Sequence, residues 1–94
     1  MTEETKKIQV RMPENLQGGV YCNNLMIAHN KEEFIMDFLF LMPPAGTVTA
    51  RVVTSPGHMK RILSALQDSV AKYEKIFGEI QKPPDPKLQI GLKH

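Results

Sequence analysis

The stretch Phe34–Thr54, which reads FIMDFLFLMPPAGTVTARVVT, decides the fold of this 94-residue chain. Residues 34–42 contain three phenylalanines and show no helical periodicity, whereas residues 47–54 are rich in β-branched side chains. Between them, residues 43–46 read PPAG, and consecutive prolines followed by a glycine favour a turn. Two strands joined by a short turn predict an antiparallel β-hairpin.

The register of this hairpin is predicted by matching apolar residues across the two strands. The best alignment places Asp37 opposite Arg51, and the other expected pairs are Ile35 with Val53, Met36 with Val52, Phe38 with Ala50, Leu39 with Thr49 and Phe40 with Val48. This register makes one sheet face wholly apolar. A slip by one residue would mix the two faces, and burial penalises such a slip.

Toward the N-terminus, residues 20–29 predict a strand that is joined to residues 34–42 by a loop at residues 29–32. The same matching brings Met26 beside Met36 and Cys22 beside Phe40 on the apolar face. The alternation of apolar and polar residues over 8–12 predicts a further short strand. Three to four antiparallel strands are therefore expected.

Two consecutive asparagines, Asn23 and Asn24, are unusual inside a strand. One of them is expected to point inward or to mark a bulge, and a buried amide needs several hydrogen bonds. We expect these side chains to serve the structure and not to bind a ligand.

Residues 56–80 predict one long helix, with Ser55 as the N-cap and Pro56 as the first helical residue. Apolar residues recur there at alternating spacings of four and three, as in a heptad repeat: Met59, Leu63, Leu66, Val70, Tyr73, Phe77 and Ile80. The predicted fold class is α+β, an antiparallel β-meander of three to four strands with this C-terminal α-helix packed on one sheet face. We expect a loose segment at 1–7, a single domain at 8–80 and a Pro-rich tail at 81–94.

The composition narrows the classes of function. Twelve basic and ten acidic residues leave a formal net charge of +2, which makes nucleic acid an improbable partner. The single cysteine, Cys22, excludes an internal disulfide and favours a reducing, cytoplasmic setting. No apolar run approaches the roughly 20 residues of a membrane span, so no membrane is expected. Because His29, His58 and His94 share no metal-ligand spacing, we expect no metal and no cofactor.

Asp37 is the most conspicuous charge, because it lies between Met36 and Phe38 in an apolar strand. A buried carboxylate needs a partner, and the predicted register offers Arg51. The favoured interpretation is a structural ion pair between Asp37 and Arg51 that sets the register or lines a subunit interface. The alternative is a catalytic carboxylate with a raised pKa, but no second acid or nucleophile accompanies Asp37, so no catalytic residue is assigned.

The start of the predicted helix is the candidate anion-binding site. Backbone N–H groups at a helix start attract anions, and three potentially cationic side chains are unexpected at the positive end of a helix dipole. The candidate residues are Ser55, Gly57, His58, Lys60 and Arg61. The segment lacks the GxxxxGK[ST] spacing of a nucleotide-binding loop, so solvated side chains are the competing interpretation.

Several short motifs carry a resemblance to a known family. They are Val20-Tyr21 with Asn23, Glu33-Phe34, Asp37-Phe38, Ala50–Val53 with Ser55-Pro56, Lys72–Glu74 and Phe77–Ile80. Over residues 18–80 the chain resembles a family of small bacterial and archaeal proteins that share a domain of unknown function. The resemblance implies no activity. The predicted architecture is also similar to the subunit plan of SecB-type export chaperones, which bind unfolded chains on apolar grooves, although no sequence motif is shared.

Two hypotheses for the function follow. The first is a non-enzymatic interaction protein, a homodimer or higher oligomer, that holds protein or peptide partners on an apolar sheet surface. It rests on the second sheet face, where Ile35, Leu39, Leu41 and Val53 are more apolar than exposure to solvent would favour. The alternative is a small-anion or nucleotide-binding module that uses the helix start. An enzyme ranks third, because no catalytic constellation is present.

Overall fold

A computed structural model describes residues 5–85 and 89–91 of the chain. His94 and parts of the two predicted terminal segments lie outside these residues. The chain divides into two compact units, residues 1–56 and 57–94, which are described separately. In chain order the elements are a 3₁₀ turn at Glu14–Leu16, β1 at Asn24–His29, β2 at Phe34–Met42, β3 at Ala45–Thr54 and α1 at Pro56–Phe77.

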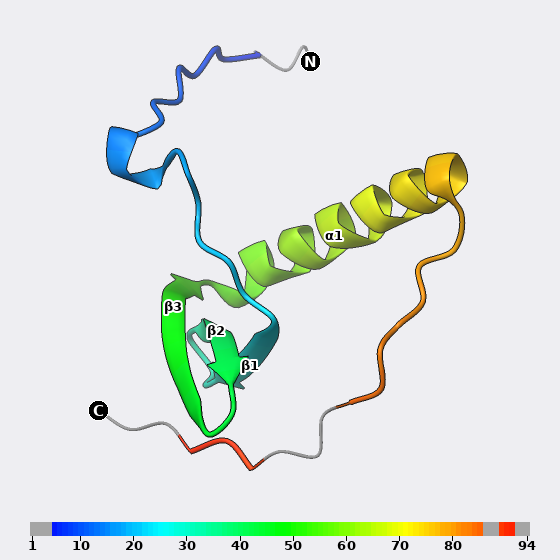
Figure 1. Ribbon diagram of the computed structural model, residues 1–94. Coiled ribbons are helices and arrows are strands. Elements are labelled where there is room, and N and C mark those ends of the chain that lie inside the picture. The colour runs from blue at the N-terminus through cyan, green and yellow to red at the C-terminus, as the bar shows by residue number, and fades with distance from the viewer. Residues whose placement is uncertain (1–4, 86–88, 92–94) are drawn as a thin grey trace. The chain divides into compact units, whose positions relative to one another are not determined.

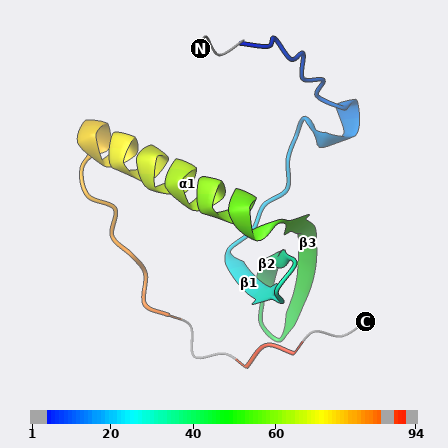
Figure 2. The same ribbon diagram turned by 180° about the vertical axis from the view of Figure 1, so that it is seen from behind.

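The first unit contains a three-stranded antiparallel sheet in the order β1-β2-β3. β2 is the central strand, as the two opposite views in Figures 1 and 2 show. Together with the C-terminal helix, this sheet confirms the α+β class and the meander. That the helix packs on a sheet face, and that residues 8–80 form a single domain, remain predictions.

The predicted strand at residues 8–12 is wrong. These residues take no regular structure, and Ile8 and Val10 are highly exposed. Three alternating apolar residues have the period of a strand, but a strand also needs a neighbouring edge to satisfy its backbone groups. β1 likewise begins at Asn24 and not at residue 20.

The register between β2 and β3 is confirmed from Ile35 to Phe38, including Asp37 opposite Arg51, and is wrong beyond Phe38. A β-bulge follows, so that Leu39 pairs with Val48 and Phe40 with Thr47. Thr49 is the extra residue of β3, and its hydroxyl donates a hydrogen bond to the carbonyl oxygen of Phe38 at 3.0 Å. The inserted residue shifts every later pair by one position.

The register between β1 and β2 differs by one residue from the prediction, because Met26 pairs with Asp37 and Ile27 pairs with Met36. The connecting turn explains the difference. The Asn30 side-chain oxygen accepts hydrogen bonds from the backbone N–H groups of Glu32 and Glu33 at 2.8 and 2.9 Å, and the Asn30 N–H donates to the Glu33 carbonyl at 3.0 Å. This Asx turn closes the hairpin between His29 and Phe34.

The prediction that Cys22 lies buried beside Phe40 is wrong, since Cys22 is exposed and precedes β1. The Tyr21 ring makes an edge contact with Phe40 instead, with ring centroids 5.7 Å apart.

The buried part of the sheet is small. Among the described residues only Met36, Asp37 and Leu39 are buried, with exposed fractions of 6%, 6% and 3%. All three belong to the central strand. Because side chains alternate between faces, Met36 lies on one face and Asp37 and Leu39 lie on the other. Each face of the sheet therefore has at least one buried side chain in the central strand.

The second unit contains all of α1 but its first residue, Pro56. The helix ends at Phe77 and not at the predicted residue 80. Gly78 stops the helix, since it has a positive φ of 95° and its N–H donates to the Glu74 carbonyl at 2.8 Å. This is the αL arrangement in which glycine ends many helices. The Ile80 N–H then donates to the Glu74 carboxylate at 2.9 Å, so Ile80 lies beyond the helix.

Candidate functional site

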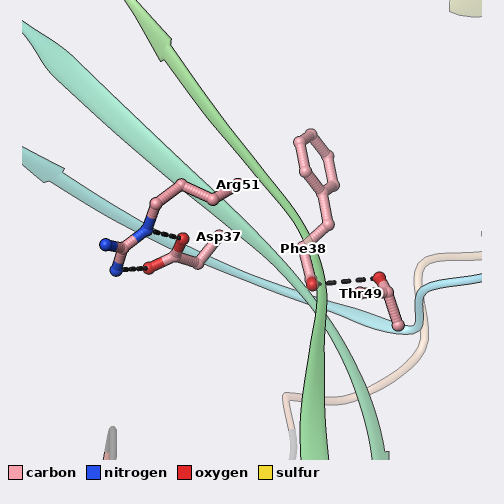
Figure 3. A network of polar contacts seen from close by, with 4 residues as sticks. All are labelled: Asp37, Phe38, Thr49 and Arg51. Atoms are coloured by element: carbon pink, nitrogen blue, oxygen red, sulfur yellow. Dashed lines mark hydrogen bonds and ion pairs between the residues drawn. The ribbon is translucent and has the colours of Figure 1, made fainter. Parts of the chain in front are cut away.

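A side-chain ion pair of the sheet joins Asp37 in β2 to Arg51 in β3 (Figure 3). Arg51 Nε donates to Asp37 Oδ1 at 2.7 Å, and Arg51 Nη2 donates to Asp37 Oδ2 at 2.9 Å. These two parallel bonds form the fork geometry that makes arginine–carboxylate pairs both strong and directional. The carboxylate is buried, whereas the Arg51 side chain is 47% exposed.

The pair determines the charge of Asp37. Hydrogen bonding from Arg51 lowers the pKa of this carboxyl, the positive charge of Arg51 lowers it further, and burial opposes both effects. The same hydrogen bond and the charge of Asp37 raise the pKa of Arg51. Asp37 is therefore an ionised acceptor at neutral pH. A general acid would need the opposite shift, a raised pKa.

The β-bulge at Thr49 changes which side chains surround this pair. Directly opposite residues share a face, so Val48 lies on the face of Leu39, and Thr47 lies with Phe40 on the other face. Val48 had been expected on the other face. We call the surface that carries the ion pair the pair face; its apolar members are Met26, Ala28, Ile35, Leu39, Leu41, Val48 and Val53. The pair face is more apolar than the sequence indicated.

Asn23 extends the sheet by means of its side chain. Its amide oxygen accepts from the Leu41 N–H at 2.8 Å, and its amide nitrogen donates to the Leu41 carbonyl at 3.0 Å. The Asn23 backbone N–H donates to the Leu39 carbonyl at 2.9 Å. The side chain thus replaces a backbone partner next to the first residue of β1. The pair of asparagines was the sequence signal for this structural role, but not for the residue that Asn23 contacts.

We expect Asn23→Asp to destabilise the protein by about 1 kcal/mol at neutral pH, because a carboxylate cannot donate to the Leu41 carbonyl. Urea unfolding measures the effect, and Asn24→Asp supplies the same charge one residue away. Part of the loss should be regained below about pH 4, where a protonated Asp can donate. Equal effects of the two variants at both pH values would contradict this role.

The candidate anion-binding residues lie at the start of α1. Ser55 directly precedes the helix, and Gly57, His58, Lys60 and Arg61 belong to its first two turns. The first turn carries no acidic residue. Ser55 and His58 each take part in a further interaction, and Lys60 and Arg61 are exposed. Anion binding at this segment stays a prediction.

Metal-ligating side chains do not gather in the described part of the chain, where no three His, Cys, Asp or Glu residues lie close enough to hold an ion. The His29 ring stacks on Phe34, with centroids 5.3 Å apart. Within the same described residues, no helix has both the length and the apolar character that crossing a membrane demands.

Comparison with known proteins identifies the family. No curated protein and no solved structure matches the chain, and the analogy to SecB-type chaperones therefore gains no support. Residues 1–82, most of the chain and the whole of the sheet and helix, match the family described as "Protein of unknown function (DUF3467)". The expected resemblance to a domain of unknown function is confirmed, and the chain belongs to the DUF3467 family.

Proposed function

We propose that this protein is a small, non-enzymatic interaction protein of the cytoplasm that self-associates and binds protein or peptide partners on the pair face. One observation carries the proposal. In the described residues only two apolar side chains, Met36 and Leu39, are buried, whereas large apolar side chains are exposed on both the sheet and the helix. On the pair face these are Val48 and Val53. Others are Leu25, Ile27 and Val52 on the opposite sheet face, and Leu66, Val70 and Phe77 in the helix.

Apolar burial is the dominant favourable term in folding, at about 25 cal/mol per Å². A chain of this length has a small margin of stability even with a complete core. Covering these side chains with protein would supply the missing burial, and a second copy is always available to do so. Exposed apolar surface beyond a few hundred Å² is typical of interaction sites.

The pair face suits recognition of another chain. Its apolar residues surround one bidentate ion pair whose Arg51 side chain is half-exposed. Arg51 uses only two of its five N–H donors on Asp37, and arginine is enriched at protein interfaces. The non-enzymatic part of the proposal is supported by the contact of Asp37 with Arg51. This contact lowers the pKa of the Asp37 carboxyl and occupies both of its oxygens with hydrogen bonds.

Sedimentation velocity from about 1 to 100 µM tests self-association, a range that brackets Kd values typical of weak to moderate interfaces. We expect the mass to rise above the 10.6 kDa of one chain as the concentration rises. A compact monomer throughout this range would overturn the proposal.

A matched pair of variants tests the use of the pair face. Val53→Glu places a charge on it, and Val52→Glu places the same charge on the opposite face one residue away. Both valines are exposed. We expect Val53→Glu to weaken binding of an extended apolar peptide about tenfold or more, since a charge in an apolar contact is costly. If Val52→Glu weakened peptide binding as much as Val53→Glu, the pair face would not be the binding surface.

A further inference from the structure

The helix α1 carries an apolar stripe along its length. We call it the helix seam; within the helix it consists of Met59, Leu63, Leu66, Val70, Tyr73 and Phe77. Met59 is half-buried and the others are exposed. Their alternating spacings of three and four place them at the a and d positions of a heptad repeat, with Leu63, Val70 and Phe77 at a. Such a seam fits a second helix.

The positions beside the seam have a symmetry of their own. One flank, the e positions, carries Lys60, Gln67 and Glu74, so the two opposite charges lie seven residues on either side of Gln67. The other flank, the g positions, carries Ile62, Ser69 and Ile76, so the two isoleucines lie seven residues on either side of Ser69. When two copies of the helix run in opposite directions, the e positions of one copy are therefore complementary to the e positions of the other. The same holds for the g positions.

We propose that α1 pairs with α1 of a second copy in antiparallel orientation, along the helix seam. In this arrangement e positions face e positions, so Lys60 of each copy faces Glu74 of the other. The dimer therefore contains two such Lys60–Glu74 contacts. The g positions also face each other, so Ile62 of each copy packs on Ile76 of the other. The inference rests on the proposed self-association and names the surface that performs it.

The seam residues form matching layers in this register. Leu66 packs against Val70 of the second copy, Leu63 against Tyr73, and Met59 against Phe77. Tyr73 and Phe77 are already in contact, with ring centroids 4.9 Å apart, and so present one continuous aromatic surface. The flexible methionine suits the wide aromatic surface that it would meet. No polar side chain falls within the seam, apart from the hydroxyl of Tyr73.

The charges favour antiparallel over parallel pairing. In a parallel pair Lys60 and Glu74 stay on the same side of the interface but fourteen residues apart, about 21 Å along the axis. That separation exceeds the screening length of about 8 Å at physiological ionic strength. Antiparallel helices also oppose their dipoles. Glu74 uses Oε2 to accept from the Ile80 N–H, and its other oxygen can receive Lys60.

Mixing two charge-swap variants tests the orientation. Lys60→Glu places two acidic groups opposite each other at both ends of the pair, and Glu74→Lys places two basic groups there. We expect each variant alone to associate on the order of tenfold more weakly than the parent chain, as expected for the loss of two surface ion pairs and their replacement by repulsion. An equimolar mixture should form heterodimers with restored affinity, because every facing pair is again opposite in charge.

The matched controls are Lys72→Glu and Asp68→Lys, which make the same charge changes on the outer face of the helix. They should neither weaken association nor show any preference on mixing. Restored affinity in the 60/74 mixture supports the antiparallel pair. If the mixture stays as weak as the separate variants while the parent chain self-associates, the helix pairing is wrong and the proposed function stands. If the parent chain remains monomeric, both fall.

The Glu74→Lys variant also removes the hydrogen bond from the Ile80 N–H. A cross-linking measurement tests the same register with Glu74 left in place. In a Cys22→Ser background, Ser69→Cys puts a lone thiol at the twofold axis of the proposed pair, where residue 69 of one copy faces residue 69 of the other. Ser64→Cys puts a lone thiol on the outer face of the helix. We expect oxidation to link Ser69→Cys into dimers at least tenfold faster than Ser64→Cys, as proximity at a bound interface raises the effective concentration of the second thiol. Equal rates would overturn the antiparallel register.

Discussion

Leu39→Ala is expected to lower the free energy of unfolding by about 2–5 kcal/mol, the range observed when a buried leucine is truncated. Leu39 is the most buried residue described, with 3% of its surface exposed, and it lies in the central strand opposite Asn24 on one side and Val48 on the other. Removing its side chain leaves a cavity on the pair face. For a chain of this size such a loss is a large fraction of the whole stability, which is about 0.05–0.15 kcal/mol per residue.

Leu25→Ala is the matched control, because it removes the same atoms from the neighbouring strand where 44% of the residue is exposed. We expect this variant to lose about 1 kcal/mol, since less area leaves water when the protein folds. Chemical denaturation, monitored by circular dichroism at one fixed protein concentration, measures both. Equal losses would mean that Leu39 is not the centre of the sheet's packing.

The second large effect is the acid sensitivity of the Asp37–Arg51 pair. The folded-state pKa of Asp37 lies below its ordinary value of 3.8, because Arg51 hydrogen-bonds to the ionised form. Between these two pKa values the unfolded chain binds more protons than the folded one. The contribution of the pair is therefore complete above the unfolded-state pKa and is lost as the pH falls through the folded-state pKa.

Urea unfolding of the parent chain and of Asp37→Asn, at about pH 6 and about pH 3, isolates this contribution. The amide keeps the shape of the carboxyl but carries no charge. We expect Asp37→Asn to be less stable at the higher pH and to lose less stability than the parent on acidification. If the two proteins lost equal stability between these pH values, the carboxylate would not carry the effect.

Removal of Arg51 alone should be worse than removal of the whole pair. Arg51→Val leaves the Asp37 carboxylate buried without its partner, whereas Asp37→Val with Arg51→Val leaves two β-branched residues on an apolar face. We expect the double variant to be more stable than Arg51→Val at neutral pH, and the gap to narrow in acid. A double variant that is less stable than the single one would contradict a purely structural role of the pair.

The sequence alone predicted the elements that depend on periodicity. The run of residues 34–54 predicted the central hairpin, and its register was right as far as Phe38, because one charged residue in each strand had to face the other. The helix was right except at its end, since its apolar stripe continued to Ile80 while Gly78, which has positive φ, stopped the backbone at Phe77. A pattern of side chains does not report a backbone conformation that only glycine favours.

The candidate sites divide in the same way. The structure joins Asp37 to Arg51, which the alignment of strands had placed opposite each other. It places the candidate anion-binding residues together at the start of α1, which already follows from their order in the sequence. Anion binding there stays a prediction. The role of Asn23 was foreseen only as a need for hydrogen bonds, because its partner Leu41 lies 18 residues away in another strand.

By itself the sequence determined the α+β class, the meander and the ion pair. Hydrophobic alternation assigns each strand residue to one face of the sheet, and a buried charge needs a partner of opposite charge on that face. Tertiary structure alone decided the bulge at Thr49, the register set by Asn30 and the sheet extension by Asn23. In each case a polar side chain completes the hydrogen bonding of a backbone group, either in another strand or at the turn between strands. Those choices depend on which backbone groups lack partners once the strands have met, and the order of residues does not show this in advance.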